Sequence, residues 1–109
     1  MTISEMVEQA HKNALEHGWY DEHRTFGELI ALCHSELSEA LEDFRNGLKP
    51  NVMLKGDGGK PCGIPSELAD VVIRIADMAG YYGIDLEAAI KAKMAYNRTR
   101  PYKHGGKKL

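Results

Sequence analysis

Residues 64–77 constrain the fold most strongly, because they combine an apolar helix with a line of charges. Pro65 and Ser66 are typical of a helix start. At about 100° per residue, apolar side chains cover most of the circumference, which predicts a buried helix. The charged side chains share one narrow stripe, formed by Glu67, Asp70, Arg74 and Asp77. Charges on a buried helix have to be paired, hydrated or bound to a cation.

Four segments show helical periodicity and predict an all-α fold of the four-helix-bundle type. Their expected ranges are 4–17, 25–45, 64 to 81 or 82, and 85–98. Ser4 and Asp85 are expected N-caps, and Gly83 is an expected left-handed stop. The connection 48–63 is rich in Pro, Gly and Lys, which predicts a loop or at most a small β-hairpin with residues 52–54 as one arm.

The length of 109 residues predicts a single domain, 1–109, with a core small enough to favour homo-oligomerisation. The net charge of -2 argues against nucleic-acid binding through bulk charge. No stretch reaches the roughly 18 to 20 apolar residues of a membrane helix, so we expect a cytoplasmic protein without a membrane partner. No acid follows Glu87, and residues 98–109 form a basic C-terminal tail. Cys33 and Cys62 are expected to be reduced.

Two pairs of acids have the spacing of one helical turn. Glu36 and Glu39 lie three residues apart in one predicted helix, and Glu67 and Asp70 lie three apart in another. If the two helices face each other, four carboxylates converge and repel unless a multivalent cation neutralises them. Oxygen ligands without His or Cys favour Mg²⁺, with Mn²⁺ as a substitute, over zinc.

A simpler interpretation of these acids stays open. One Glu-x-x-Glu pair on a helix is usually a solvated face, and Glu67 and Asp70 could be neutralised by Arg74 and the basic tail. Asp77 could extend the acidic stripe or pair with Arg74. Under that interpretation the charges are structural and bind no metal.

The run Ser35-Glu-Leu-Ser-Glu39, followed after 27 residues by Glu67-Leu-Ala-Asp70, resembles the signature of the MazG-like branch of the all-α nucleoside triphosphate pyrophosphohydrolases. The resemblance extends to 93–97 and 100–106 and covers roughly residues 15–107. It implies that the four acids hold Mg²⁺ and that water attacks between the α- and β-phosphates, giving a nucleoside monophosphate and pyrophosphate. Ser35 replaces an acid of some relatives, which leaves the number of metal ions open.

The resemblance also implies nucleotide contacts. Lys93 and Asn97 lie four apart on one helical face and are the contacts carried over from the family, and Arg100 and Lys103 follow within reach. Trp19 is the single Trp and is the candidate for stacking on the base, although it could instead fill one end of the bundle. Glu39 or Asp70 is the candidate for orienting the water.

Three functional hypotheses follow. The first is a Mg²⁺-dependent nucleoside triphosphate pyrophosphohydrolase in nucleotide-pool housekeeping, acting as a homodimer or a dimer of dimers. The second is a non-catalytic helical module that binds nucleotides or a protein partner, and the third is a structural dimer whose charges satisfy each other. Ala69, Ile73 and Ala76, on the side of their helix away from the acids, form the candidate interface.

Overall fold

The computed structural model describes residues 1–101 and contains four α-helices and one short β-hairpin. The helices are α1 (Ile3–Glu16), α2 (Phe26–Arg45), α3 (Ile64–Tyr81) and α4 (Leu86–Thr99). The strands β1 (Leu54–Lys55) and β2 (Pro61–Cys62) pair antiparallel around a 3-10 turn at Asp57–Gly59. The predicted all-α class and its four helices are therefore confirmed, and the predicted hairpin arm overlaps β1 only at Leu54.

Side chains at the helix starts explain where three of the helices begin. Thr25 and Asp85 each accept a backbone N–H three residues ahead, and Asp85 is the predicted cap. The predicted N-cap of α1, Ser4, was wrong by two positions. Thr2 caps α1 and forms a reciprocal capping box with Glu5, so Ser4 lies inside the first turn. Gly83, at a φ of 65°, follows α3 as predicted.

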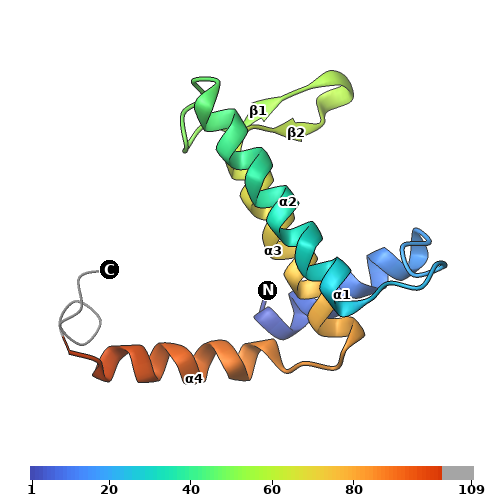
Figure 1. Ribbon diagram of the computed structural model, residues 1–109, viewed down its shortest axis with the longest axis vertical. Coiled ribbons are helices and arrows are strands. Elements are labelled where there is room, and N and C mark those ends of the chain that lie inside the picture. Colours follow the sequence, from blue (N-terminus) through green and yellow to red (C-terminus); the bar gives the residue numbers. More distant parts are fainter. Residues whose placement is uncertain (102–109) are drawn as a thin grey trace.

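Helices α2 and α3 lie side by side and antiparallel, with the β-hairpin at their far end (Figure 1). Helix α1 packs against α3 near the other end of this pair. The core therefore lies where α1, α2 and α3 meet. Both cysteines are free thiols, as expected.

The two halves of α3 differ in burial. Ala76, Asp77, Met78 and Ala79 are buried in the C-terminal half. In the N-terminal half the first residue, Ile64, is buried, but Leu68 and Val72 are 45% and 47% exposed. The prediction of a buried helix thus holds for only one half within a single chain. Ala76 is 0% exposed, so it belongs to the core of its own chain and was wrongly assigned to an interface.

Helix α4 extends away from α2 and α3 and packs mainly against α1 (Figure 1). The Ser4 N–H donates to Glu87 Oε1 at 3.2 Å and ties the start of α4 to α1. From residue 91 to residue 100 every position is exposed. Within residues 1–101, every helix is too short or too polar to span a lipid bilayer.

Candidate functional site

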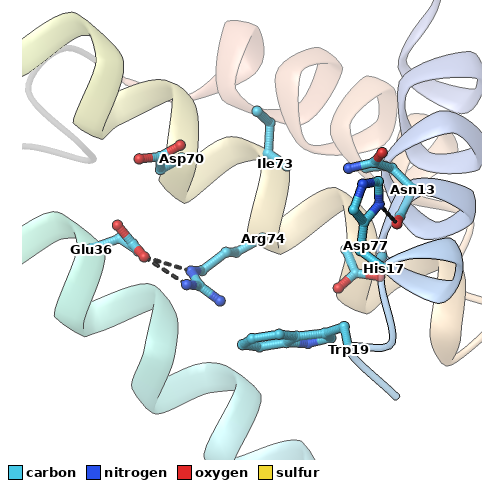
Figure 2. A pocket seen from close by; sticks show the side chains of 10 residues that line it. Asn13, His17, Trp19, Glu36, Asp70, Ile73, Arg74 and Asp77 are labelled. Atoms are coloured by element: carbon cyan, nitrogen blue, oxygen red, sulfur yellow. Dashed lines mark hydrogen bonds and ion pairs between the residues drawn. The ribbon is translucent and has the colours of Figure 1, made fainter. Parts of the chain in front are cut away.

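Three of the four predicted acids form a tight group between α2 and α3. Carboxylate oxygens of Glu36, Glu67 and Asp70 all lie within 4.8 Å of one another, and we call these residues the acid cluster. Glu36 projects from α2 toward Asp70 on α3 (Figure 2). The three-residue spacing of Glu67 and Asp70 places both on one face of α3, as the periodicity predicts. In the structure this face lies toward Glu36 of α2.

Glu39, the fourth predicted acid, lies beside Glu67. The pKa of Glu67 is raised to about 7, first because burial disfavours its charged form. A hydrogen bond with Glu39 and the negative charges of Glu39, Asp70 and Asp43 raise that pKa further. Glu39 thus lies next to the acid cluster, so that the carboxylates of both predicted pairs are near one another. Repulsion between them contributes to the raised pKa of Glu67.

The donor set of the acid cluster fits a hard divalent cation. All three ligand atoms are carboxylate oxygens, which suit Mg²⁺ and Mn²⁺. Around Mg²⁺, oxygen ligands at roughly 2.1 Å from the ion stand about 3 to 4 Å from each other. The oxygens of the acid cluster lie within 4.8 Å of one another, which is close to this range.

Arg74 forms the ion pair nearest to the acid cluster. Its Nε and Nη2 lie 2.8 Å and 2.7 Å from the same oxygen, Oε1 of Glu36. Arg74 therefore pairs with Glu36 of α2. It does not pair with Glu67 or Asp70 on its own helix, which was the predicted neutralisation. The alternative in which Arg74 pairs with Asp77 was wrong.

A pocket of about 340 Å³ lies next to the acid cluster, between α1, α3 and the segment after α1 (Figure 2). Trp19 forms part of its wall, together with Arg74 and Ile73. The guanidinium carbon of Arg74 lies 5.0 Å from the centroid of the Trp19 ring, and that of Arg24 lies 4.0 Å from it. The remaining lining residues are Ala10, Asn13, Ala14, His17, Glu36, Asp70 and Asp77. The structure thus brings Trp19 and two of the acids to one pocket.

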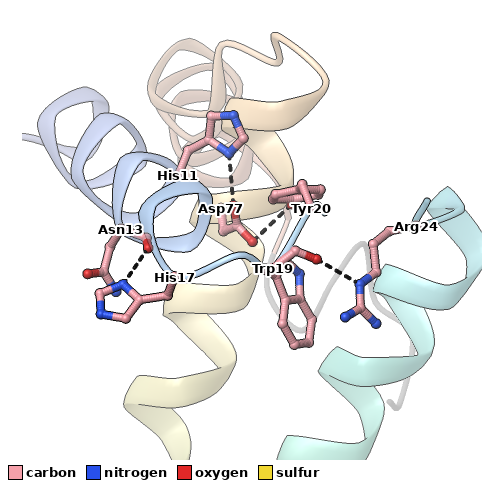
Figure 3. Close-up of polar contacts among 7 residues, drawn as sticks. All are labelled: His11, Asn13, His17, Trp19, Tyr20, Arg24 and Asp77. Atoms are coloured by element: carbon pink, nitrogen blue, oxygen red, sulfur yellow. Dashed lines mark hydrogen bonds and ion pairs between the residues drawn. The ribbon is translucent and has the colours of Figure 1, made fainter. Parts of the chain in front are cut away.

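Asp77 closes one wall of this pocket through contacts that the sequence analysis missed (Figure 3). Asp77 is 7% exposed, and its two oxygens lie 2.9 Å from His11 Nδ1 and from the Tyr20 hydroxyl. A carboxylate only accepts, so His11 Nδ1 carries the hydrogen. Burial and the bond to Asp77 raise the pKa of the Tyr20 hydroxyl. The sequence feature that could have indicated this contact is the position of His11, four residues after Val7 on the apolar face of α1.

Gly80 allows α1 to approach α3 closely at this point. A Cβ atom at position 80 would lie 2.6 Å from Cβ of His11, which is shorter than real contacts allow. The absence of a side chain at Gly80 therefore lets His11 reach Asp77, one turn earlier on α3.

The predicted nucleotide contacts on α4 lie apart from the acid cluster within one chain. Lys93 and Asn97 are exposed on α4, Arg100 is exposed directly after it, and none of the three lines the pocket. Lys93 Nζ lies 5.8 Å from the ring of Tyr96 on the same helix. Lys103 lies outside the described residues. The roles of these four residues stay predictions.

Fold and site define an all-α protein in which a helix pair carries a carboxylate cluster beside a pocket with an aromatic wall. Over 38 residues, 35% of the chain, the sequence is 47% identical to a protein of Cyanophage S-2L named dATP/dGTP diphosphohydrolase. The match spans 36% of the length of that relative. No protein-family model and no solved structure matches the chain. This similarity supports at most the family of nucleoside triphosphate pyrophosphohydrolases.

Proposed function

We propose that this protein is a Mg²⁺-dependent nucleoside triphosphate pyrophosphohydrolase that releases a nucleoside monophosphate and pyrophosphate. The observation that carries the proposal is the convergence of Glu36, Glu67 and Asp70 beside a pocket that contains Trp19. The partial similarity to a dATP/dGTP diphosphohydrolase makes deoxyadenosine and deoxyguanosine triphosphates the first substrates to test. Housekeeping of the nucleotide pool is the corresponding role.

In this proposal the acid cluster, together with Glu39, holds the cation. A bound Mg²⁺ would neutralise phosphate charge and favour attack by water. Glu39 or Asp70 orients the water and accepts its proton. The water oxygen bonds to the α-phosphorus, the bond from that phosphorus to the bridging oxygen breaks, and the electron pair leaves with pyrophosphate.

The pocket supplies the binding site for the nucleoside. Its volume of about 340 Å³ falls in the range of small-molecule sites. Trp19 offers an aromatic ring for base stacking, which tolerates any base. Choice between bases therefore depends on the polar side chains of the wall, of which Asn13 and His17 come from the end of α1.

We further propose that the working form is a homodimer or homotetramer. Leu37, Leu41 and Phe44 follow one another along α2 and are 51%, 58% and 59% exposed. They line a second, apolar hollow of about 550 Å³. A second copy packed on this surface would remove apolar area from water. It would also offer its own α4, so that Lys93, Asn97 and Arg100 could approach an acid cluster that they do not reach within one chain.

The proposed catalytic role is tested by removing one charge from the acid cluster without changing side-chain shape. Glu67→Gln is expected to lower Mg²⁺-dependent pyrophosphate release at least about 100-fold while the protein still melts cooperatively. Glu42→Gln is the matched control, because Glu42 lies on α2 outside the cluster and pairs only with Arg45, at 3.9 Å, among the described residues. Full activity of Glu67→Gln would remove the acid cluster from the reaction.

The alternative, a non-catalytic module that binds nucleotides or a protein, makes a different prediction. Such a module would bind a triphosphate in the pocket, quench or shift the emission of Trp19, and leave the triphosphate intact. Binding without pyrophosphate release across canonical and modified triphosphates would favour this alternative.

A further inference from the structure

Arg74 binds a carboxylate that belongs to the proposed metal site, that of Glu36. The Nε–H group of its guanidinium donates to Oε1 of Glu36 at 2.8 Å, and Nη2 lies 2.7 Å from the same oxygen in the ion pair. Glu36 belongs to the acid cluster, whose oxygens lie within 4.8 Å of one another. Charge-assisted contacts of this kind are strong, so a cation that binds the Glu36 carboxylate has to compete with the guanidinium.

The same guanidinium borders the pocket on its other side. Its carbon lies 5.0 Å from the Trp19 ring, and both side chains line the pocket (Figure 2). Arg74 therefore contacts both halves of the proposed site, the acid cluster and the aromatic wall. Movement of this one side chain changes the surroundings of both.

Arg24 provides a natural comparison. Its guanidinium also lies over Trp19, at 4.0 Å, and its Nε donates to the Trp19 carbonyl oxygen at 3.0 Å (Figure 3). The carboxylate that it pairs with is Glu28, at 3.5 Å, which lies outside the acid cluster. Two arginines thus flank one aromatic ring, and only Arg74 extends to the cluster.

We propose that Arg74 is a positioning residue that competes with the divalent cation for Glu36 and turns toward the pocket when the cation binds. The inference rests on the metal site of the proposed function. A cation among the three carboxylates repels the guanidinium and takes over the lone pairs of Glu36. The released side chain stays tethered beside Trp19, so that occupancy of the acid cluster changes the wall of the nucleoside pocket.

The test uses Mn²⁺ and Mg²⁺ without nucleotide. Affinity is measured by titration calorimetry, and the single Trp of the chain reports the position of Arg74 through its fluorescence. In the wild-type protein the cation is expected to change Trp19 emission. Arg74→Met is expected to bind the cation about tenfold more tightly, as loss of a competing ion pair of about 1.4 kcal/mol predicts, and its Trp19 emission should no longer respond.

Two further variants separate competition from a general effect of charge. Arg24→Met also removes one positive charge beside Trp19, and it is expected to alter the resting emission while keeping the wild-type affinity and response. Arg74→Lys keeps the charge but loses the paired N–H groups, so its affinity should lie between wild type and Arg74→Met. This second variant also tests the inference if Arg74→Met fails to fold.

Unchanged or weaker cation binding by Arg74→Met overturns the role of Arg74 and leaves the metal site standing. Equal tightening in Arg24→Met also overturns it, because a general field effect would then explain the result. If neither the wild type nor the folded Arg74 variants bind Mn²⁺, the metal site of the proposed function fails, and the inference fails with it.

Discussion

The two halves of α3 differ in how their charged side chains are surrounded. In the C-terminal half, buried Asp77 receives hydrogen bonds from His11 and Tyr20 within the same chain. In the N-terminal half, no Lys or Arg in the described part of the chain pairs with Glu67 or Asp70, and apolar neighbours such as Leu68 are exposed. The charge of the C-terminal half is therefore satisfied within one chain, and the charges of the N-terminal half are not satisfied within residues 1–101.

The difference indicates that the N-terminal half of α3 is the part that would gain from a cation or a second copy of the chain. Hydrogen-bonded burial of one carboxylate is compatible with a stable core. At Glu67, by contrast, burial and then the neighbouring carboxylates raise the pKa to about 7. A cation would relieve that repulsion, and a second copy would cover the apolar neighbours. In the proposed function, the packed half positions the site and the open half carries its acids.

The largest expected effect on stability comes from Asp77→Ala. It leaves the half-buried His11 and Tyr20 side chains without their acceptor, so we expect a loss of about 3 kcal/mol in the free energy of unfolding. Urea denaturation measures this loss. Asp70→Ala, on the same helix, is the control and should cost nothing or stabilise slightly, because it removes a like charge. An equal loss in the free energy of unfolding for the two substitutions would contradict the proposed difference between the two halves of α3.

A smaller effect is expected from Leu41→Glu on self-association. A charge in the exposed apolar row on α2 should weaken the proposed dimer at least about 30-fold, or about 2 kcal/mol. Sedimentation of micromolar protein measures the change in mass. Leu15→Glu alters an exposed apolar residue of α1 and should leave the mass unchanged. A monomeric wild-type protein would refute the dimer itself.

Lys93→Ala tests the contribution of α4. If Lys93 of one copy contacts the phosphates bound by another, KM should rise about tenfold without any change in melting temperature. Lys91→Ala is the matched control, since Lys91 lies one half-turn earlier and pairs with Glu87 at 3.5 Å. Equal kinetics for both variants would separate α4 from the nucleotide site.

The smallest effect concerns the pH dependence of the metal-free protein. The pKa of Glu67 rises from an ordinary value of 4.5 to about 7 on folding, so the folded state binds this proton more tightly than the unfolded state. Stability therefore increases as the pH falls from about 7 to about 4.5, by an amount that we place near 1 kcal/mol after screening. Thermal melts in a chelator measure it, and Glu67→Gln should lose this dependence. A wild-type protein that instead gains stability as the pH rises through this window would contradict it.

Local chemistry made much of the fold predictable. Thr25, Asp85 and Gly83 fix helix ends through contacts with residues close in sequence. The periodicity placed Glu36 and Glu39 on one face of α2, and Glu67 and Asp70 on one face of α3. These features depend on spacing within a helix, which the sequence displays directly.

Contacts between distant residues were beyond this reasoning. His11 and Asp77 are separated by 66 positions, and Arg74 and Glu36 by 38. These pairs form because particular helix faces pack against each other. Periodicity within each helix does not determine which faces pack together. The outward direction of α4 was missed for the same reason, because its spacing is equally compatible with packing against α2 and α3.

The products of triphosphate hydrolysis test the central claim most directly. Deoxyguanosine or deoxyadenosine triphosphate is incubated with the protein and Mg²⁺ in ¹⁸O-labelled water, and the phosphorus products are followed by NMR. We expect pyrophosphate and a nucleoside monophosphate that carries the label. Labelled inorganic phosphate with a nucleoside diphosphate, or no turnover of any triphosphate by folded protein that binds Mg²⁺, would contradict it.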